Sequence, residues 1–232
     1  MKALIVDDEP LARRELRRLL GAFPSVEIAG EAGNIDEARE RIETLAPDVV
    51  FLDIQMPGGT GFDLLAQLDR VPRIVFTTAY DQYAVKAFEV SALDYLLKPI
   101  EPERLANALR KIQAAPHVPH DAPLDQLFVR DGPRCWFVPL REVSLFSAEG
   151  NYVRMLWGQE RPLLGRSLAA LELKLDPQRF FRANRGQILN LDFIRQVDLG
   201  EGGRLHVQLR DGPEVEVSRR QARLFRARST VV

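Results

Sequence analysis

The stretch VVFLDIQMPGGTGFDLL, residues 49–65, joins a short apolar run to a segment with helical periodicity. The run at 49–52 ends at Asp53, and the helical pattern extends over 61–69. A continuous apolar run of this length is typical of a strand that is covered on both faces, as in a parallel sheet. A strand followed directly by a helix is the unit from which such sheets are built.

The same unit recurs on both sides of this stretch, across residues 1–112. The other apolar runs, the second of which is weaker, lie at 3–6, 26–29, 74–76 and 95–97. The other expected helices lie at 12–23, 35–45, 81–92 and 102–114. Asn34, with Glu37 three residues later, resembles a capping box at the start of one helix. Five such units predict a doubly wound α/β fold with a five-stranded parallel sheet.

The second half of the chain has a different period. Apolar and polar residues alternate over 205–217 across an Asp–Gly pair, and a second Asp–Gly pair at 131–132 lies between further apolar residues. This pattern is typical of β hairpins. Helical periodicity is confined to about 167–174 and 219–227. We therefore expect a mainly β second domain.

The length of 232 residues fits two small domains. We place them at 1–112 and 126–232, joined by a linker at 113–125. Three prolines between 114 and 123 predict a semi-extended, fairly stiff linker.

Several classes of protein are disfavoured by composition. No apolar run approaches the 18 residues of a membrane span, and the start turns acidic too early for a signal peptide, so we expect a cytoplasmic protein without membrane partners. The single cysteine, Cys135, rules out an intramolecular disulfide and is interpreted as a buried, reduced thiol. His117, His120 and His206 do not form a zinc pattern.

The net charge of −1 hides an asymmetry between the two halves. Residues 1–112 hold 14 Lys and Arg against 19 Asp and Glu, whereas 113–232 hold 18 against 14, and 17 of those 18 cations are arginine. Arginine suits bidentate contacts to phosphate and guanine, so the excess slightly favours a nucleic-acid partner. Taken alone, the Arg-rich segment at 219–228 is more often a solvated helix face.

Polar residues of the first half gather where predicted strands end. These residues are Asp7, Asp8, Asp53, Thr77, Thr78 and Lys98. The carboxyl ends of parallel strands form the ligand crevice of open α/β sheets. Three carboxylates there need a cation, and oxygen ligation favours Mg²⁺ or Mn²⁺ over zinc. A metal ion, an ammonium group and a hydroxyl group around one carboxylate suit phosphoryl transfer. We favour this interpretation over the alternative, in which these residues are only solvated polar groups at strand ends.

The segments LIVDDEP, VVFLDIQMPGGTGFDLL, FTTAY and DYLLKPI resemble the signature segments of response-regulator receiver domains, in the same order and spacing. The resemblance implies a flavodoxin-like fold in which Asp53 accepts phosphate from a sensor histidine kinase. Asp8 would bind the metal directly, Asp7 through water, and Gln55 through its backbone carbonyl. The resemblance also implies roles for Thr78 as switch hydroxyl, Tyr95 as switch aromatic and Lys98 as phosphoryl contact, with a cis peptide bond before Pro99. Thr77 would be a neighbour on the opposite face.

The segments LFSAEGNYVRMLW, FFRANRGQILNLDFI and VEVSRRQARLFR resemble LytTR DNA-binding domains, which contact double-stranded DNA through loops. The positions that the resemblance implies as DNA contacts are Asn151, Tyr152, Arg185, Arg219, Arg220 and Arg223. The second loop departs from the family, because Asn184-Arg185-Gly186 stands where His-Arg-Ser is common.

Together the two resemblances imply a phosphorylation-dependent transcriptional regulator that is not an enzyme apart from phosphoryl self-transfer and hydrolysis. We expect it to form a homodimer through the receiver face at 81–114. One alternative is a Mg²⁺-dependent phosphohydrolase with an aspartyl nucleophile, against which the absence of a substrate-capping insertion counts. Another is an output domain that binds protein instead of DNA.

Overall fold

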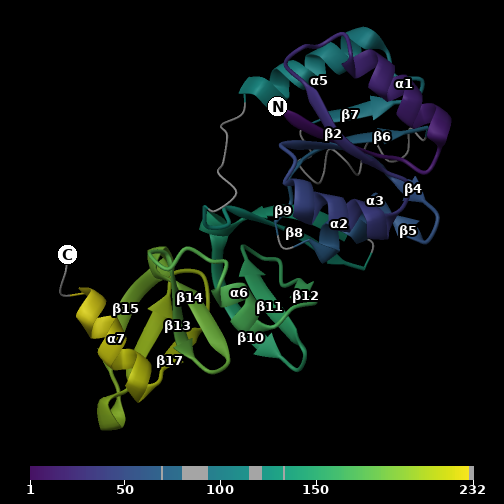
Figure 1. Cartoon of the computed structure of the whole chain (residues 1–232). Helices are drawn as coiled ribbons and strands as arrows, with labels where there is room; N and C mark the ends of the chain where they lie inside the picture. The colour runs from purple at the N-terminus through teal and green to yellow at the C-terminus, as the bar shows by residue number, and fades with distance from the viewer. Residues whose placement is uncertain (69, 80–93, 115–121, 133, 230–232) are drawn as a thin grey trace. The chain divides into compact units, whose positions relative to one another are not determined.

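A computed structural model of the chain describes residues 1–68, 70–79, 94–114, 122–132 and 134–229. The chain forms two compact units, one made mainly of Met1–Ala122 and the other mainly of Pro123–Pro133 and Val138–Val232 (Figure 1). Residues 115–121 of the predicted linker lie outside the described residues, and its first two positions belong to a helix that ends at Ala114.

The first unit is built around a five-stranded parallel sheet with the spatial order β2-β1-β3-β6-β7. Its strands are β1 (Lys2–Val6), β2 (Glu27–Ala32), β3 (Val49–Asp53), β6 (Arg73–Thr78) and β7 (Asp94–Leu97). The apolar residues of the central strands β1 and β3 are fully buried, which explains why their sequences lack alternation. The predicted α/β sheet is confirmed.

Helices cover both faces of this sheet (Figure 1). The helices are α1 (Pro10–Leu20), α2 (Ile35–Leu45), α3 (Gly61–Gln67) and α5 (Pro102–Ala114). Apolar residues of α1 and α5 share one core cluster with β1, β3, β6 and β7. On the other face, the ring of Phe62 in α3 lies 4.9 Å from that of Phe76 in β6. The predicted helix 61–69 ends at Gln67, and the predicted helix 81–92 lies outside the described residues.

The predicted cap of α2 is half correct. The Asn34 side chain accepts a hydrogen bond from the Glu37 amide at 2.9 Å. Glu37 does not return a bond to the Asn34 amide in the manner of a capping box; its carboxylate accepts from the Gly33 amide at 3.0 Å instead. This bond is the main reason that the pKa of Glu37 lies below its usual value.

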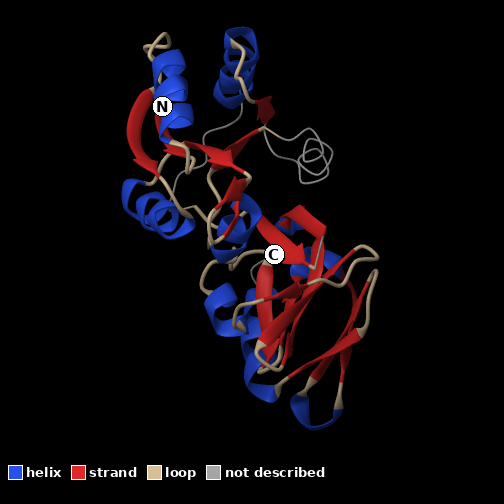
Figure 2. Cartoon of the chain, turned by 90° about the vertical axis from the view of Figure 1, so that its right-hand side faces the viewer, coloured by secondary structure: helices blue, strands red, loops and turns tan. Residues whose placement is uncertain are grey.

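The second unit consists mainly of antiparallel strands, as predicted (Figure 2). One sheet has the order β12-β11-β10-β14-β13, a second β15-β16-β17, and β8 pairs with β9. The strands are β8 (Gln126–Asp131), β9 (Arg134–Pro139), β10 (Val143–Glu149), β11 (Tyr152–Trp157), β12 (Leu163–Leu164), β13 (Phe180–Asn184), β14 (Gln187–Asn190), β15 (Ile194–Leu199), β16 (Leu205–Leu209) and β17 (Glu214–Val217). Both predicted hairpins are confirmed, as β8–β9 and β16–β17.

Two helices complete this unit, α6 (Leu168–Glu172) and α7 (Arg219–Ser229), near the positions predicted for them. The larger sheet and the β15-β16-β17 sheet bury one apolar cluster between them, and α7 packs Ala222 and Phe225 against it. The β15 strand forms an edge of its sheet, and all its residues after Ile194 are exposed. Short 3-10 turns lie at Leu140–Glu142, Leu191–Phe193 and Glu201–Gly203.

Cys135 is partly exposed, so its predicted burial is wrong; it lies in a two-stranded hairpin, where residues have fewer covering neighbours. None of the helices in the described part of the chain is long and apolar enough to cross a membrane.

Candidate functional site

Three carboxylates meet at the carboxyl edge of the parallel sheet. Asp7 and Asp8 directly follow β1, and Asp53 is the last residue of the neighbouring strand β3. One oxygen from each of the three groups lies within 4.8 Å of the others. The parallel β1–β3 pairing explains this meeting, because it brings the ends of both strands to one edge.

Lys98 lies between two of these acids. Its Nζ is 2.7 Å from Oδ2 of Asp7 and 2.7 Å from Oδ2 of Asp53. Burial disfavours the charged lysine, but its hydrogen bonds to Asp53 and Asp7 outweigh this effect and raise the pKa of Lys98. The Lys98–Pro99 peptide bond is cis, as expected. A single ammonium group thus serves two nearly buried carboxylates.

The cluster remains short of positive charge. Burial raises the pKa of the Asp53 carboxyl above its usual value; Lys98 opposes the rise without cancelling it, and Asp7 adds to it. A raised carboxyl pKa means that the anion lacks solvation and counter-charge. An additional cation at this edge would therefore stabilise the ionised form of Asp53.

The chain after Asp53 is shaped to keep this carboxylate in place. The Gln55 amide donates to Asp53 Oδ1 at 3.2 Å, and a short hairpin of β4 (Gln55–Met56) and β5 (Gly59–Thr60) leads to α3. Thr60 and Asp63 form a capping box at the start of α3. A Cβ at Gly61 would lie 2.6 Å from the Asp53 carbonyl oxygen, so only glycine allows α3 to begin this close to the acid.

The predicted switch residues lie on the neighbouring strands. The β3–β6 register places Thr77 beside Asp53, and Thr78 follows one residue further on; both are buried. The Lys98 amide donates to the Thr78 carbonyl at 2.8 Å, which joins the ends of β6 and β7. Tyr95 is a buried residue of β7. The fold thus brings Thr78 and Lys98 to the same edge as Asp53, whereas Tyr95 lies within β7, paired with Phe76; the roles of these residues stay predictions.

The residues at this edge fit a divalent cation. Mg²⁺ and Mn²⁺ prefer oxygen ligands, and Asp7, Asp8 and Asp53 supply three carboxylates without a competing histidine or thiol among them. With Lys98 as the fourth charged group, three negative charges face one positive charge. A doubly charged cation would balance the cluster.

In the second unit, three segments converge at one end of the larger sheet. The 150–151 turn between β10 and β11 lies beside the 185–186 turn between β13 and β14, because the Ala148 amide donates to the Gly186 carbonyl at 2.7 Å. The start of α7 joins them through the Ser218 amide, which donates to the Ala183 carbonyl at 3.0 Å. Every predicted DNA contact lies on one of these segments or at its border.

All six predicted DNA contacts are exposed to solvent, namely Asn151, Tyr152 and the four arginines 185, 219, 220 and 223. No ion pair joins Arg185, Arg220 or Arg223 to another residue within the described ranges. By contrast, Arg228 donates to the Pro177 carbonyl at 2.8 Å and lies over the Phe181 ring, so it helps to anchor α7.

Sequence reasoning missed the residues that hold the 185–186 turn. The Asn184 side chain accepts from the Gly186 amide at 2.8 Å and donates to the Gln187 side chain at 2.9 Å and to the Glu216 carbonyl of β17 at 2.8 Å. The Arg182 guanidinium donates to the backbone carbonyls of Asn184 and Arg185. The departure from His-Arg-Ser at 184–186 was the available signal, since Asn side chains commonly bond to nearby backbone.

Comparison with known proteins identifies both units. Residues 3–110 match the model of the response regulator receiver domain, and residues 134–229 match that of the LytTr DNA-binding domain. An uncharacterized response regulatory protein of Vibrio cholerae is 40% identical, covering 95% of this chain and 94% of the relative. The sensory transduction protein LytT of Enterococcus faecalis is 36% identical, with 97% and 98% covered. The positive alginate biosynthesis regulatory protein of Pseudomonas aeruginosa is 37% identical, with 95% of each covered.

The fold and the two matched domains define a response regulator, in which a receiver controls a DNA-binding output domain. The chain belongs to the LytTR family of response regulators. It is accordingly a phosphorylation-dependent regulator of transcription, and its domains are those of a regulator rather than of a catalytic enzyme. The alternatives of a phosphohydrolase and of a protein-binding output are therefore not retained.

Proposed function

We propose that Asp53 is the phosphoacceptor and that phosphorylation there controls DNA binding by the second unit. The observation that carries this proposal is the ammonium group of Lys98, 2.7 Å from both Asp53 and Asp7. An oxygen of the Asp53 carboxylate attacks phosphorus of a phosphohistidine on a sensor histidine kinase. An O–P bond forms, the P–N bond breaks, and its electron pair stays on the imidazole.

Mg²⁺ or Mn²⁺ would be held by the carboxylates of Asp8 and Asp53, by Asp7 through water, and by the Gln55 carbonyl. When bound, the ion supplies positive charge that neutralises the transferring phosphoryl oxygens. Two residues of the chain have further roles in the transfer. The Gln55 amide orients the Asp53 carboxylate, and Lys98 neutralises charge on the side where phosphoryl oxygens accumulate.

Phosphorylation changes the charge balance of the Lys98 bridge. A phosphoryl group brings about two negative charges where the carboxylate had one, and it adds strong acceptor oxygens. Lys98 is drawn toward the phosphoryl group, and the Thr78 hydroxyl can donate to it. Since the Lys98 and Thr78 backbones are hydrogen-bonded, both strand ends respond together, with Tyr95 on β7 as the switch aromatic.

We further propose that the phosphorylated protein dimerises through the receiver face at 81–114, of which 81–93 lie outside the described residues. Two output units would then bind paired half-sites on double-stranded DNA through Asn151, Tyr152 and the arginines at 185, 219, 220 and 223. A regulator that acts on chromosomal DNA works in the bacterial cytoplasm, where its partner kinase presents phosphohistidine.

The test uses acetyl phosphate with Mg²⁺, analysed by phosphate-affinity electrophoresis and intact mass. We expect the wild type to gain one phosphoryl group and to bind DNA more tightly, whereas Asp53→Asn should gain none and keep its fold. The matched control is Asp48→Asn, which neutralises a partly exposed carboxylate just before β3 that accepts a hydrogen bond from the Lys2 amide. Undiminished labelling of Asp53→Asn would refute the assignment of the acceptor.

A further inference from the structure

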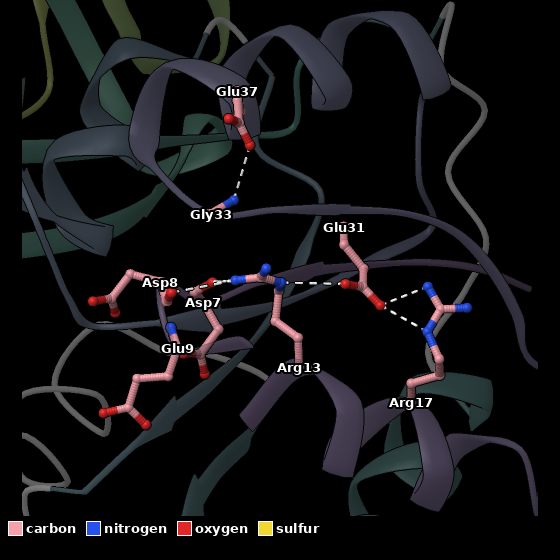
Figure 3. Close-up of polar contacts among 8 residues, drawn as sticks. All are labelled: Asp7, Asp8, Glu9, Arg13, Arg17, Glu31, Gly33 and Glu37. Atoms are coloured by element: carbon pink, nitrogen blue, oxygen red, sulfur yellow. Dashed lines mark hydrogen bonds and ion pairs between the residues drawn. The ribbon is translucent and has the colours of Figure 1, made fainter. Parts of the chain in front are cut away.

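Arg13 of α1 binds the backbone of Asp7 and Asp8, the two acidic residues that follow β1. Arg13 NH1 donates to the carbonyl oxygen of Asp7 at 2.7 Å and to that of Asp8 at 3.3 Å (Figure 3). Its Nε donates to Oε2 of Glu31 on β2 at 3.2 Å, and the Arg13 side chain is only 20% exposed. One guanidinium therefore connects the loop after β1 to the neighbouring strand.

Glu31 is itself held from the other side. Its Oε1 accepts a hydrogen bond from Arg17 Nε at 2.7 Å, so the carboxylate bridges two arginines one helical turn apart (Figure 3). The arrangement is local to α1 and β2 and uses no carboxylate oxygen of Asp7 or Asp8. Arg13 therefore does not compete with Lys98, or with a cation at the edge of the sheet, for those carboxylate oxygens.

The contact acts on the backbone that determines where the acids point. The strand ladder continues to the Asp7 amide, which donates to Ala32, and the Glu9 amide closes a tight turn onto Asp7 Oδ1 at 3.0 Å. Beyond these bonds, Arg13 donates to the backbone carbonyls of both Asp7 and Asp8 and so ties the two peptide groups to α1. The orientation of these two peptide groups sets the direction of the Asp7 and Asp8 side chains.

We propose that Arg13 is a positioning residue for the metal site: it holds the Asp7–Asp8 loop in the conformation that presents both carboxylates, while Glu31 orients its guanidinium. This inference rests on the proposed metal site. Charge alone predicts the opposite effect, because a cation close to a cation site weakens metal binding. The sign of the change in affinity therefore separates positioning from electrostatics.

The experiment measures Mg²⁺ affinity of the full chain by calorimetry for the wild type, Arg13→Ala, Arg13→Lys and Arg14→Ala. Arg14 is the matched control, since it is the next residue of α1, is exposed, and carries the same charge. Loss of groups that orient metal ligands typically weakens affinity 10- to 100-fold, so we expect Arg13→Ala to weaken Mg²⁺ binding by about ten-fold. Arg13→Lys keeps the charge, but an ammonium group lacks the planar guanidinium that donates to the two carbonyls and to Glu31 at once. This variant should therefore weaken Mg²⁺ binding by a smaller factor than Arg13→Ala does.

A second measurement reports on the conformation of the Asp7–Asp8 loop in the metal-free protein. Hydrogen exchange of a peptide covering residues 4–10 should be faster in metal-free Arg13→Ala than in the wild type and unchanged in Arg14→Ala. Equal or tighter Mg²⁺ binding by Arg13→Ala would overturn the proposal, as would unchanged exchange in this peptide. The wild-type affinity tests the metal site itself, so a wild type that binds no Mg²⁺ refutes that site, whereas the mutant-to-wild-type ratio and the exchange rates test Arg13.

Discussion

Replacing Asn184 by alanine removes three hydrogen bonds from the 185–186 turn, to the Gly186 amide, the Gln187 side chain and the Glu216 carbonyl. Each such bond contributes roughly 0.5–1.5 kcal/mol net, and this turn is only partly buried, so we expect unfolding of the second unit to require about 2 kcal/mol less. For a domain of about 100 residues this lowers Tm by roughly 10 °C. The turn that carries Arg185 also loses its fixed shape, so affinity for DNA falls.

Tryptophan fluorescence is a suitable assay, because Trp157 lies in β11 of the second unit. Thermal unfolding should show the lower Tm, and the Gly186 amide should exchange faster in the free protein. The control, Arg185→Ala, removes an exposed side chain and should lose DNA affinity at unchanged Tm. If Asn184→Ala were as stable as the wild type and still bound DNA poorly, Asn184 would be a direct DNA contact, and its role in holding the 185–186 turn would be refuted.

Asp8→Ala should weaken Mg²⁺ binding, measured by calorimetry, while metal-free stability rises because carboxylate repulsion is relieved; unchanged affinity would contradict the site. Lys98→Met leaves two nearly buried carboxylates without their cation, so urea unfolding should show a loss of about 3 kcal/mol that Mg²⁺ partly restores. Arg220→Ala or Arg185→Ala should cost roughly 1–3 kcal/mol at the cognate site and relax one base preference if the side chain reads guanine. Arg223→Ala should weaken cognate and scrambled duplexes alike and reduce the salt slope by about one ion. Uniform losses for all three variants would make each a phosphate contact.

The elements of the receiver could be predicted from sequence because each carries a strong local signal. The run at 49–52 is apolar throughout since both faces of β3 are covered, and Asp53 is the buried polar residue with which the strand ends. Parallel pairing then dictates that strand-end residues share one edge. For this reason the meeting of Asp7, Asp53 and Lys98 follows from the order of strands and polar residues alone.

The supporting contacts could not be predicted in the same way, because their partners are set by tertiary structure. Arg13 and Glu31 are 18 residues apart, and each looks like an ordinary charged residue on an exposed face. Asn184 reaches Glu216 across 32 residues only because β17 lies beside β13. Even the short-range partner of Glu37 differed from the expected one, since the backbone before Asn34 offers the Gly33 amide at a better position.

The strand β15 is an exposed sheet edge, and a few charged side chains on it oppose pairing with other chains. Val197 is 39% and Leu199 81% exposed, and they share one face of the strand, because the β15–β16 register pairs them with Val207 and Leu205. An open edge with apolar side chains is a template on which other chains can add strands, and charged residues on such edges suppress that pairing. Arg195 and Asp198 are the charges present on β15. Replacing either charge by an apolar residue should increase self-association of the chain, while the acidic cluster and the 150–151 and 185–186 turns stay unchanged.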